Sequence, residues 1–351
     1  MRILIATDAW HPQVNGVVRT LTSLARAVEK LGATIEFLSP EGFPSVRVPT
    51  YPGLRLALPR PGKIARRIEQ AKPDAIHIAT EGTIGMMTRA WCLRQGQPFT
   101  TSYTTRFPEY ISARWSIPQS WIYAALRRFH GAAAVTMVAT PSLTAELSQR
   151  GFRNLGMWTR GVDPDLFGPD RAIELDWPRP IFISVGRIAV EKNLAAFLSL
   201  DLPGTKVVIG AGPQEAELRQ RFPDAKFLGL LENGKLSGHL AAADVFVFPS
   251  RTDTFGVVQL EALASGVPVA AFPVTGPKDV IGSNPIGALN EDLRVACLKA
   301  LTMSRAACRD YALAHSWENS ARQFVGNIKR IVPGNAGRSQ LHSPVAATAS
   351  G

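Results

Sequence analysis

The chain contains two series of short, apolar segments, and each series alternates with segments of helical spacing. The first series begins with RILIATD at residues 2–8, followed by helical spacing over 17–31; the second begins with PIFISVGR at 180–187, followed by helical spacing over 193–200. Further apolar segments occupy residues 75–79, 99–103, 134–140, 206–210, 245–249 and 268–272. Apolar strands separated by helices are typical of parallel sheets covered on both faces. The pattern predicts an α/β fold with two doubly wound, Rossmann-like domains.

The join between these domains is predicted near RGVDPDLFGPD, residues 160–170, which is rich in Gly, Pro and Asp. We therefore expect a first domain over residues 1–165 and a second over 166–315. A last amphipathic helix is expected within 315–331, and the tail 333–351 has so little to bury that we expect it to be disordered. Ligands of doubly wound sheets lie beyond the carboxyl ends of the strands, so the expected site is the cleft between the two domains.

Composition narrows the cellular setting. The three cysteines, Cys92, Cys297 and Cys308, form no C-x-x-C pair, which fits a reducing cytoplasm and gives no support to a disulfide framework or a zinc site. No window reaches 18 uninterrupted apolar residues, so no transmembrane helix is expected. The apolar run after Arg2 ends at Thr7 and is too short for the core of a secretory signal.

The formal net charge of +11 is concentrated in the first half of the chain. Residues 1–170 contain 20 Lys and Arg against 12 Asp and Glu, whereas the remainder contains 19 against 16. Nucleic acid, an anionic membrane surface, or no specific partner would each account for this excess. The charge alone leaves the three alternatives open.

Two cations follow the strand that opens the second series. Arg187 and Lys192 lie five residues apart in a strand-to-helix loop, where helix amides already favour anions, so together they could clamp a diphosphate. Alone, such a pair would more often be solvated surface. The next strand is followed by GAGPQEAEL, in which Gly212 would let the backbone approach a phosphate or base. This segment departs from the dinucleotide fingerprint, because Glu215 replaces its third glycine, and so a hydride-transfer enzyme is disfavoured.

A third segment, TDTFGVVQLEALASG at residues 252–266, carries two carboxylates eight residues apart, on Asp253 and Glu261. It follows a buried strand and starts a helix, so its first residues should form a loop and a first turn whose amides suit an anion or sugar oxygens. Asp253 would serve equally as a helix N-cap. The nearby Asp163-Pro-Asp165 imitates a metal-binding Asp-x-Asp, but Asp-Pro is also ordinary turn chemistry, which is the favoured interpretation.

Together these motifs resemble the family-4 retaining glycosyltransferases of GT-B fold, over roughly residues 1 to 331. The resemblance rests on motifs in the family's order: NGVVRT (15–20), GVDPDLFGP (161–169), GRIAVEKN (186–193), GAGP (210–213), the D-x7-E segment, SGVPV (265–269) and HSWE (315–318). It implies that a final helix, 316–332, crosses back and completes the first domain. It also implies a nucleotide-sugar substrate, no metal and no resident cofactor.

The resemblance assigns roles to matching positions. Arg187, Lys192 and Asp253 would be catalytic, the two cations neutralising the departing diphosphate and Asp253 holding the donor sugar. Glu261 would bind the nucleotide ribose. The other residues expected to contact the donor are Gly16, Gly212, Thr254, Phe255, Gly256, Val257 and Val258. On the sugar and acceptor side we expect Asp8, Asn15, Thr104 and Arg106.

Two positions depart from the family pattern. Asp253 stands where Glu is usual, and its shorter arm would shift the sugar slightly. Thr104 stands where lipid-acting relatives commonly have His. His77 is a candidate substitute, although a strand His is often a satisfied core residue. A Thr at 104 leaves room for a C6 carboxylate, with Arg106 or another nearby cation as counter-charge, so a uronic-acid donor is one hypothesis and a neutral hexose the other.

SYTTRFPEYISARW, residues 102–115, resembles the glycosyl-diacylglycerol and sulfolipid synthases and also the lipid-linked mannosyltransferases. The following stretch combines interfacial aromatics with cations, which suits a protein bound peripherally to the inner face of the cell membrane. The expected membrane residues are Arg114, Trp115, Trp121, Arg127 and Arg128. The alternative is that the aromatics are core and the arginines are solvated.

The leading expectation is transfer of a hexose or hexuronate, UDP-glucose and UDP-glucuronate being favoured donors, to a lipid, with diacylglycerol as the expected acceptor. A GDP-mannose-dependent mannosyltransferase acting on a lipid or saccharide is the alternative, and a sugar-nucleotide epimerase is possible on the same fold. A basic nucleic-acid-binding protein is the non-enzymatic alternative. It is disfavoured because no recognised binding module is present, so no nucleic-acid partner is expected.

Overall fold

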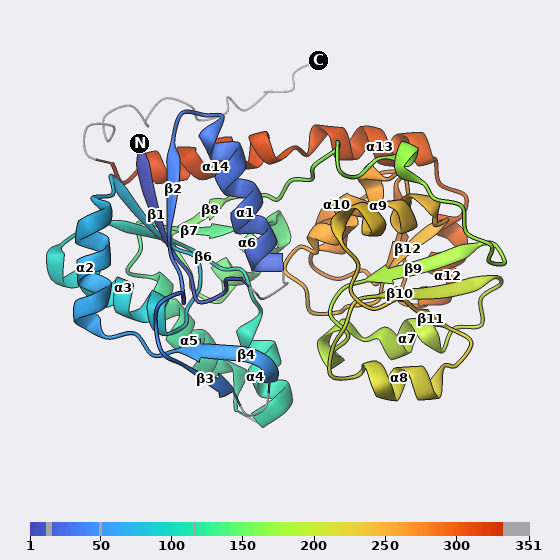
Figure 1. Ribbon diagram of the computed structural model, residues 1–351, viewed down its shortest axis with the longest axis horizontal. Helices are drawn as coiled ribbons and strands as arrows, with labels where there is room; N and C mark the ends of the chain where they lie inside the picture. Colours follow the sequence, from blue (N-terminus) through green and yellow to red (C-terminus); the bar gives the residue numbers. More distant parts are fainter. Residues whose placement is uncertain (12–15, 49–50, 116, 333–351) are drawn as a thin grey trace, which may run out of the picture.

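The computed structural model describes residues 1–11, 16–48, 51–115 and 117–332, without the side chains of residues 47–48, 51–55, 113–115 and 233. It contains two α/β domains side by side (Figure 1). The predicted tail 333–351 lies outside the described residues. The boundaries at 165/166 and 315/316 remain predictions.

The first domain is built on a six-stranded parallel sheet with strand order β2-β1-β5-β6-β7-β8. Its strands are β1 (Arg2–Ala6), β2 (Thr34–Leu38), β5 (Ala75–Ile78), β6 (Phe99–Ser102), β7 (Val135–Val138) and β8 (Leu155–Met157). The antiparallel hairpin β3 (Ser45–Val48) and β4 (Tyr51–Ala57) is separate from this sheet. The helices between them are α1 (Gly16–Glu29), α2 (Pro61–Ala71), α3 (Thr83–Gln95), α4 (Phe107–Trp115), α5 (Gln119–His130) and α6 (Pro141–Gln149).

The second domain repeats this architecture with strand order β11-β10-β9-β12-β13-β14, again parallel throughout. Its strands are β9 (Ile181–Val185), β10 (Thr205–Ile209), β11 (Lys226–Phe227), β12 (Val245–Phe248), β13 (Val269–Ala271) and β14 (Gly287–Leu289). Its helical elements are η1 (Pro169–Arg171), η2 (Val190–Lys192), α7 (Leu194–Leu198), α8 (Glu215–Arg221), α9 (Asn233–Ala242), α10 (Val257–Ala264), α11 (Pro277–Val280), α12 (Leu293–Ala300) and α13 (Arg305–Ala314). The predicted fold class, with two Rossmann-like domains, is confirmed.

The apolar strands are explained by burial on both faces. In β1, Ile3 and Ile5 pack in the cluster formed with α1 and the last helix, whereas Leu4 and Ala6 pack in the cluster formed with α2 and α3. Because successive side chains of a strand point to opposite faces, a strand covered on both sides must be apolar throughout. The same reason accounts for most of the predicted strands of both sheets, whereas β6 is equally buried but carries Thr100, Thr101 and Ser102.

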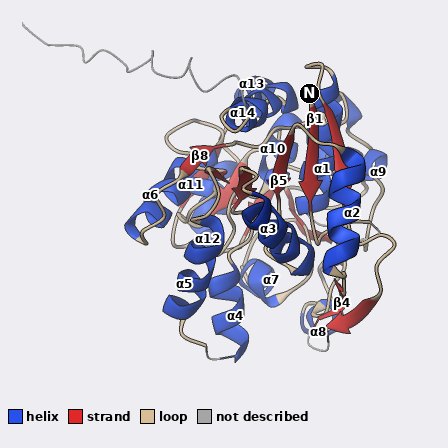
Figure 2. Ribbon diagram, turned by 90° about the vertical axis from the view of Figure 1, so that its left-hand side faces the viewer, coloured by secondary structure: helices blue, strands red, loops and turns tan. Residues whose placement is uncertain are grey.

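The last helix, α14 (Trp317–Lys329), leaves the second domain and packs against α1 of the first (Figure 1). It passes beside the linker between the domains, where Val162 pairs with Ser316 in an isolated parallel bridge. A Cβ added at Gly161 would lie 2.4 Å from the Trp317 amide nitrogen, so only glycine permits this approach. Figure 2 shows α14 at the opposite end of the molecule from α4 and α5. No helix in the described part of the chain is long and apolar enough to span a membrane.

Candidate active site

Two cationic side chains lie together at the carboxyl end of the second sheet. Arg187 and Lys192 occupy the loop between β9 and α7, and both line a small cavity that also contacts Gly186 and Ser250. Gly186 has φ of +152° and no heavy atom within 4 Å of the position of an added Cβ. The backbone at Gly186 is therefore accessible beside the two cations, an arrangement suited to an anionic ligand.

Asp253 lies within contact of this pair, because its carboxylate forms a hydrogen-bonded ion pair with the Lys192 ammonium. Both side chains are partly exposed, Asp253 at 17% and Lys192 at 28%. The sequence analysis assigned Lys192 to the diphosphate and Asp253 to the sugar. In the structure these two side chains form an ion pair with each other, so a bound donor would contact a positive and a negative group side by side.

The first turn of α10 follows directly. Gly256 precedes the helix with φ of +78°, and a Cβ there would lie 2.6 Å from the Phe248 ring, which explains the glycine. Phe255 is buried in the domain core, and Val257 and Val258 pack against that core. These three side chains therefore point into the protein, so only their backbone groups could contact a bound donor.

Gly212 has a structural reason beyond the expected donor contact. A Cβ at Gly212 would lie 2.2 Å from the Ile188 carbonyl oxygen. The two loops are held together there by hydrogen bonds from the Ile188 amide to the Ala211 oxygen (3.0 Å) and from the Gln214 amide to the Ile188 oxygen (3.1 Å). The glycine thus allows the Arg187 loop to be braced by the next loop of the sheet.

Glu261 is buried, at 5% exposure, and reaches across the cleft. Its carboxylate is 3.2 and 3.3 Å from one nitrogen of Arg19, which projects from α1 of the first domain. Burial raises the pKa of Glu261, and Arg19 opposes this rise. Sequence analysis missed Arg19, although it lies within the NGVVRT motif; only the glycine of that motif was considered.

Gly16 begins α1, and nothing lies within 4 Å of a Cβ added there, so its backbone is open to an approaching group. Asn15 lies outside the described residues.

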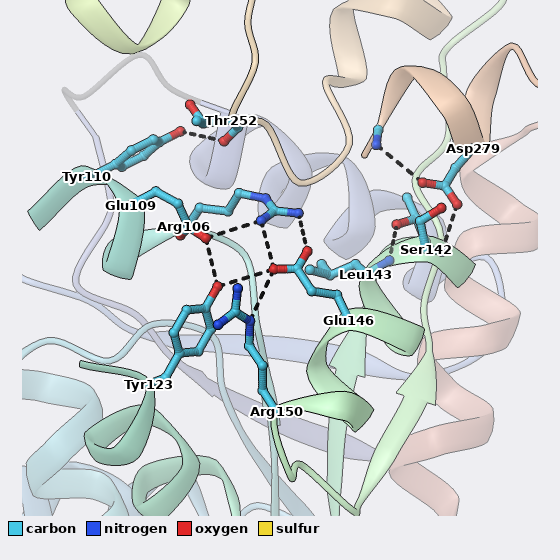
Figure 3. A network of polar contacts seen from close by, with 12 residues as sticks. Arg106, Glu109, Tyr110, Tyr123, Ser142, Leu143, Glu146, Arg150, Thr252 and Asp279 are labelled. Carbon is cyan, nitrogen blue, oxygen red and sulfur yellow. Dashed lines mark hydrogen bonds and ion pairs between the residues drawn. The ribbon is translucent and has the colours of Figure 1, made fainter. Parts of the chain in front are cut away.

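Two further hydrogen bonds join the first domain to the loop that precedes α10. The Thr254 hydroxyl donates to the Thr104 carbonyl oxygen (3.0 Å), and the Tyr110 hydroxyl donates to the Thr252 carbonyl oxygen (3.3 Å; Figure 3). Thr104 therefore lies beside the loop that precedes α10, and its role on the sugar side stays a prediction. Its own hydroxyl is buried and has no hydrogen-bond partner in the described part of the chain.

Asp8 requires a correction. Its carboxylate accepts hydrogen bonds from the Thr80 hydroxyl (2.8 Å) and from the Ile84 and Gly85 amides (2.8 and 3.3 Å) at the start of α3. Burial raises the pKa of Asp8, and these hydrogen bonds oppose the rise. The carboxylate satisfies the orphan amides of a helix end, so its acceptor capacity is committed to the fold rather than to a substrate.

Arg106 also requires a correction. Its guanidinium forms ion pairs with Glu146 (2.7 Å) and Glu109 (3.3 Å), and it is 7% exposed. Tyr123 donates to Glu109 (2.7 Å) in the same network, which joins α4, α5 and α6 (Figure 3). The charge of Arg106 is already compensated by Glu146 and Glu109, so this guanidinium is unsuited to pair with a carboxylate of the sugar.

His77 is a satisfied core residue and no substitute for a cleft histidine. It is fully buried, and its two ring nitrogens form hydrogen bonds with the hydroxyls of Thr100 (2.8 Å) and Ser102 (3.1 Å). Burial is the main cause that lowers the pKa of His77 to about 3. The imidazole is therefore neutral and committed to the sheet.

The expected membrane residues are only partly described. Trp121 is 71% exposed at the start of α5, and Arg127 and Arg128 are exposed near its end. The side chains of Arg114 and Trp115 lie outside the described part. Tyr123 and Phe129, by contrast, are core, so Trp121 is the exposed one of the three aromatics of α5.

The Asp163-Pro-Asp165 segment forms a turn. The Asp163 carboxylate accepts from the amides of Asp165 (3.0 Å) and Leu166 (3.1 Å), as in an Asx turn. Within the described residues there is no group of three His, Cys, Asp or Glu side chains that could hold a metal ion. The turn interpretation of this segment is the one that the geometry supports.

Comparison with known proteins agrees with this architecture. Residues 14–166 match the model of Glycosyltransferase Family 4, and residues 179–302 match that of Glycosyl transferases group 1. The solved structure of a sucrose-phosphate synthase from Thermosynechococcus elongatus superposes with a TM-score of 0.73 and 20% identity, covering 94% of this chain and 98% of that one.

Curated relatives extend the match. The chain is 31% identical to sulfoquinovosyl transferase SQD2 of Arabidopsis thaliana, over 78% of this chain but only 60% of that protein. It is 29% identical to a GDP-mannose-dependent alpha-mannosyltransferase of Mycobacterium tuberculosis (94% and 97% covered) and 24% identical to alpha-monoglucosyldiacylglycerol synthase of Streptococcus pneumoniae (92% and 83%). With both halves matched and the two-domain fold in place, the chain belongs to the family-4 glycosyltransferases of GT-B fold.

Proposed function

We propose that the protein transfers a hexose or hexuronate from a nucleotide sugar to a lipid, with retention of configuration and without a metal ion or a resident cofactor. The observation that carries this proposal is the group formed by Arg187, Lys192 and Asp253 beside the open backbone at Gly186. Two fixed cations in a partly enclosed site are suited to stabilise the charge that develops on a departing diphosphate. The carboxylate of Asp253 would then accept hydrogen bonds from the hydroxyls of the donor sugar.

The ribose is assigned to Glu261. A buried carboxylate at the edge of the cleft is a strong acceptor for hydroxyl groups, and in this arrangement Arg19 orients it and opposes the rise in pKa that burial causes. UDP-glucose and UDP-glucuronate are the favoured donors. GDP-mannose is the alternative, favoured by the mannosyltransferase relative that matches over nearly its whole length.

Diacylglycerol is the proposed acceptor, with the protein bound peripherally at the inner face of the cell membrane. The diacylglycerol-modifying relative supports the acceptor. On α5, the exposed Trp121 and the exposed Arg128 lie seven residues apart and hence on one helix face, which suits an anionic lipid surface. Nucleic acid is not a proposed partner.

A donor and acceptor panel tests the proposal. Purified protein is incubated with UDP-glucose, UDP-glucuronate or GDP-mannose and with vesicles that contain diacylglycerol, and the lipid products are separated by thin-layer chromatography. We expect a glycolipid from a UDP-sugar, an α-linkage by NMR, and undiminished rate in EDTA. Product only from GDP-mannose would select the alternative, and loss of activity in EDTA would refute metal independence. Filter binding to mixed DNA and RNA serves as the counter-test for the non-enzymatic alternative.

A further inference from the structure

Arg160, the third residue after β8, is a buried cation without a carboxylate partner. It is 5% exposed, and one guanidinium nitrogen donates to the Trp158 carbonyl oxygen at 2.7 Å. The guanidinium carbon also lies 4.2 Å from the centroid of the Trp158 ring. Its remaining nitrogens have no hydrogen-bond partner in the described part of the chain, and no acidic side chain there forms an ion pair with it.

Three other arginines of this protein have more hydrogen-bond or ion-pair partners than Arg160. Arg106 has two carboxylate partners. Arg305 donates to two carbonyl oxygens (2.7 and 2.8 Å), and Arg309 donates to three (2.6 to 3.1 Å). A guanidinium has five donor hydrogens, so most of the donors of Arg160 have no partner in the described part of the chain and are available to a ligand. The single bond of Arg160 sets it apart from these residues.

The position of Arg160 places it at the ligand-binding edge of the first sheet. It follows the carboxyl end of β8, and parallel sheets of this kind bind ligands beyond that end. Arg160 stacks on Trp158, no acidic side chain in the described part of the chain forms an ion pair with it, and its charge contributes, after burial, to the lowered pKa of the neutral His77. Burial lowers the pKa of Arg160 to about 10, so the guanidinium remains charged at neutral pH.

We propose that Arg160 binds an oxyanion of the substrate, a carboxylate, sulfonate or phosphate group, in the cleft. A planar guanidinium with unused donors matches such a group in a bidentate manner. This inference rests on the proposed function and deepens it. It requires that the donor sugar or the acceptor lipid carries an anionic group in addition to the diphosphate of the donor. The oxyanion has two sources, a substituent on C6 of the donor sugar or the head group of the acceptor lipid.

Paired substrates distinguish the sources. Arg160→Met removes the charge and keeps the length of the side chain. The ratio of kcat/KM is measured for UDP-glucuronate against UDP-glucose, and for phosphatidylglycerol, an anionic lipid that keeps free glycerol hydroxyls, against diacylglycerol. In Arg160→Met we expect kcat/KM for the anionic member of one pair to fall about 10- to 100-fold, the scale for a hydrogen bond to a charged group. The value of kcat/KM for its neutral counterpart should change little. The affected pair identifies the source. Arg309→Met, which removes a partly buried arginine bonded only to carbonyl oxygens, should lower Tm without altering either ratio.

Equal losses on both members of each pair would overturn the inference and make Arg160 a structural residue. If the wild-type protein transfers no sugar at all, the proposed function fails, and Arg160 is then tested by binding alone. In the presence of saturating UDP, glucuronate or inorganic phosphate should raise the Tm of the wild type but not that of Arg160→Met, and the absence of any shift in the wild type would refute the oxyanion site. Should Arg160→Met not fold, Arg160→Lys, which keeps the charge but lacks the fork, is expected to show the same selective loss in smaller degree.

Discussion

Arg19 in α1 and Glu261 in α10 form an ion pair that connects the two domains across the cleft, with distances of 3.2 and 3.3 Å. Glu261 is buried, whereas the Arg19 side chain is about one-third exposed, at 34%. The carboxylate proposed to hold the ribose is thus already held by the opposite domain. If Glu261 binds the ribose as proposed, nucleotide binding and the relative placement of the two domains are linked through this side chain.

The first prediction concerns this pair. Burial raises the pKa of Glu261 above its ordinary value of 4.5, so the folded protein keeps this proton to a higher pH than the unfolded chain does. Ionisation of Glu261 in the folded protein therefore lowers the free energy of unfolding at pH values above the folded-state pKa, and Arg19 makes this loss smaller. Arg19→Met should lower the free energy of unfolding by about 1–3 kcal/mol near neutral pH. The deficit should shrink as the pH falls through the folded-state pKa of Glu261, as measured by urea unfolding at a series of pH values.

Glu261→Gln is the matched control, since it removes the charge that Arg19 compensates. When Arg19→Met is added to this variant, the second substitution should cost little at any pH. A deficit that is independent of pH and persists in the double variant would mean that Arg19 stabilises the fold by packing alone.

Much of the fold was predictable because burial on both faces makes a strand apolar throughout. β5, β6, β7, β9, β10, β12 and β13 are buried along most or all of their length and were found, although β6, Phe-Thr-Thr-Ser, is mostly polar and β10 contains a lysine. β2 was not, because it lies at the sheet edge and its sequence, TIEFL, alternates in burial. β11, β13 and β14 are only two or three residues long, and of these only β13 lies within an apolar run long enough to detect.

The site was predictable where a loop has a fixed place after a strand, as for Arg187 and Lys192. It was not predictable where partners come from the other domain. Arg19 and Glu261 are 242 residues apart, and no local pattern connects them. Likewise, the carboxylates of Glu146 and Glu109 that occupy Arg106 belong to separate helices, so the sequence did not reveal that its charge is compensated.

The second prediction concerns the diphosphate clamp. Arg187→Ala and Lys192→Ala should each lower kcat by about 100-fold or more, the scale for loss of a fixed donor to developing charge. Lys192→Ala also leaves Asp253 without its partner, so its KM for the nucleotide sugar should change as well. Arg221→Ala, on the far helix α8 and paired with Glu217 at the surface, serves as control and should retain wild-type rates. Rates within about threefold of the wild type for both clamp variants would remove these residues from the mechanism.

The third prediction concerns membrane docking. Charge reversal at Arg127 and Arg128 should weaken binding to anionic vesicles at least about tenfold, because each cation near the surface contributes about 1 kcal/mol. Arg127 also donates to the Arg150 carbonyl oxygen (2.9 Å), so Arg128→Glu alone provides the cleaner comparison. Lys299→Glu, a position on α12 of the second domain, controls for net charge. If the Lys299→Glu variant and the α5 variants sediment equally with vesicles, the face of α5 is not the docking surface.

The last prediction concerns Thr104, whose carbonyl oxygen contacts Thr254 in the donor loop and whose hydroxyl is unpartnered in the described structure. An imidazole here would fill the space that a C6 carboxylate needs, so Thr104→His should lower kcat/KM for UDP-glucuronate more than for UDP-glucose. Because Arg106 is paired with Glu146, its substitution should not reproduce this selectivity. Thr104→Ser keeps a hydroxyl in a smaller side chain and should preserve the ratio of the two donors. The measurement is direct competition between the donors, and an unchanged ratio in Thr104→His would leave a neutral hexose as the donor that this position accommodates.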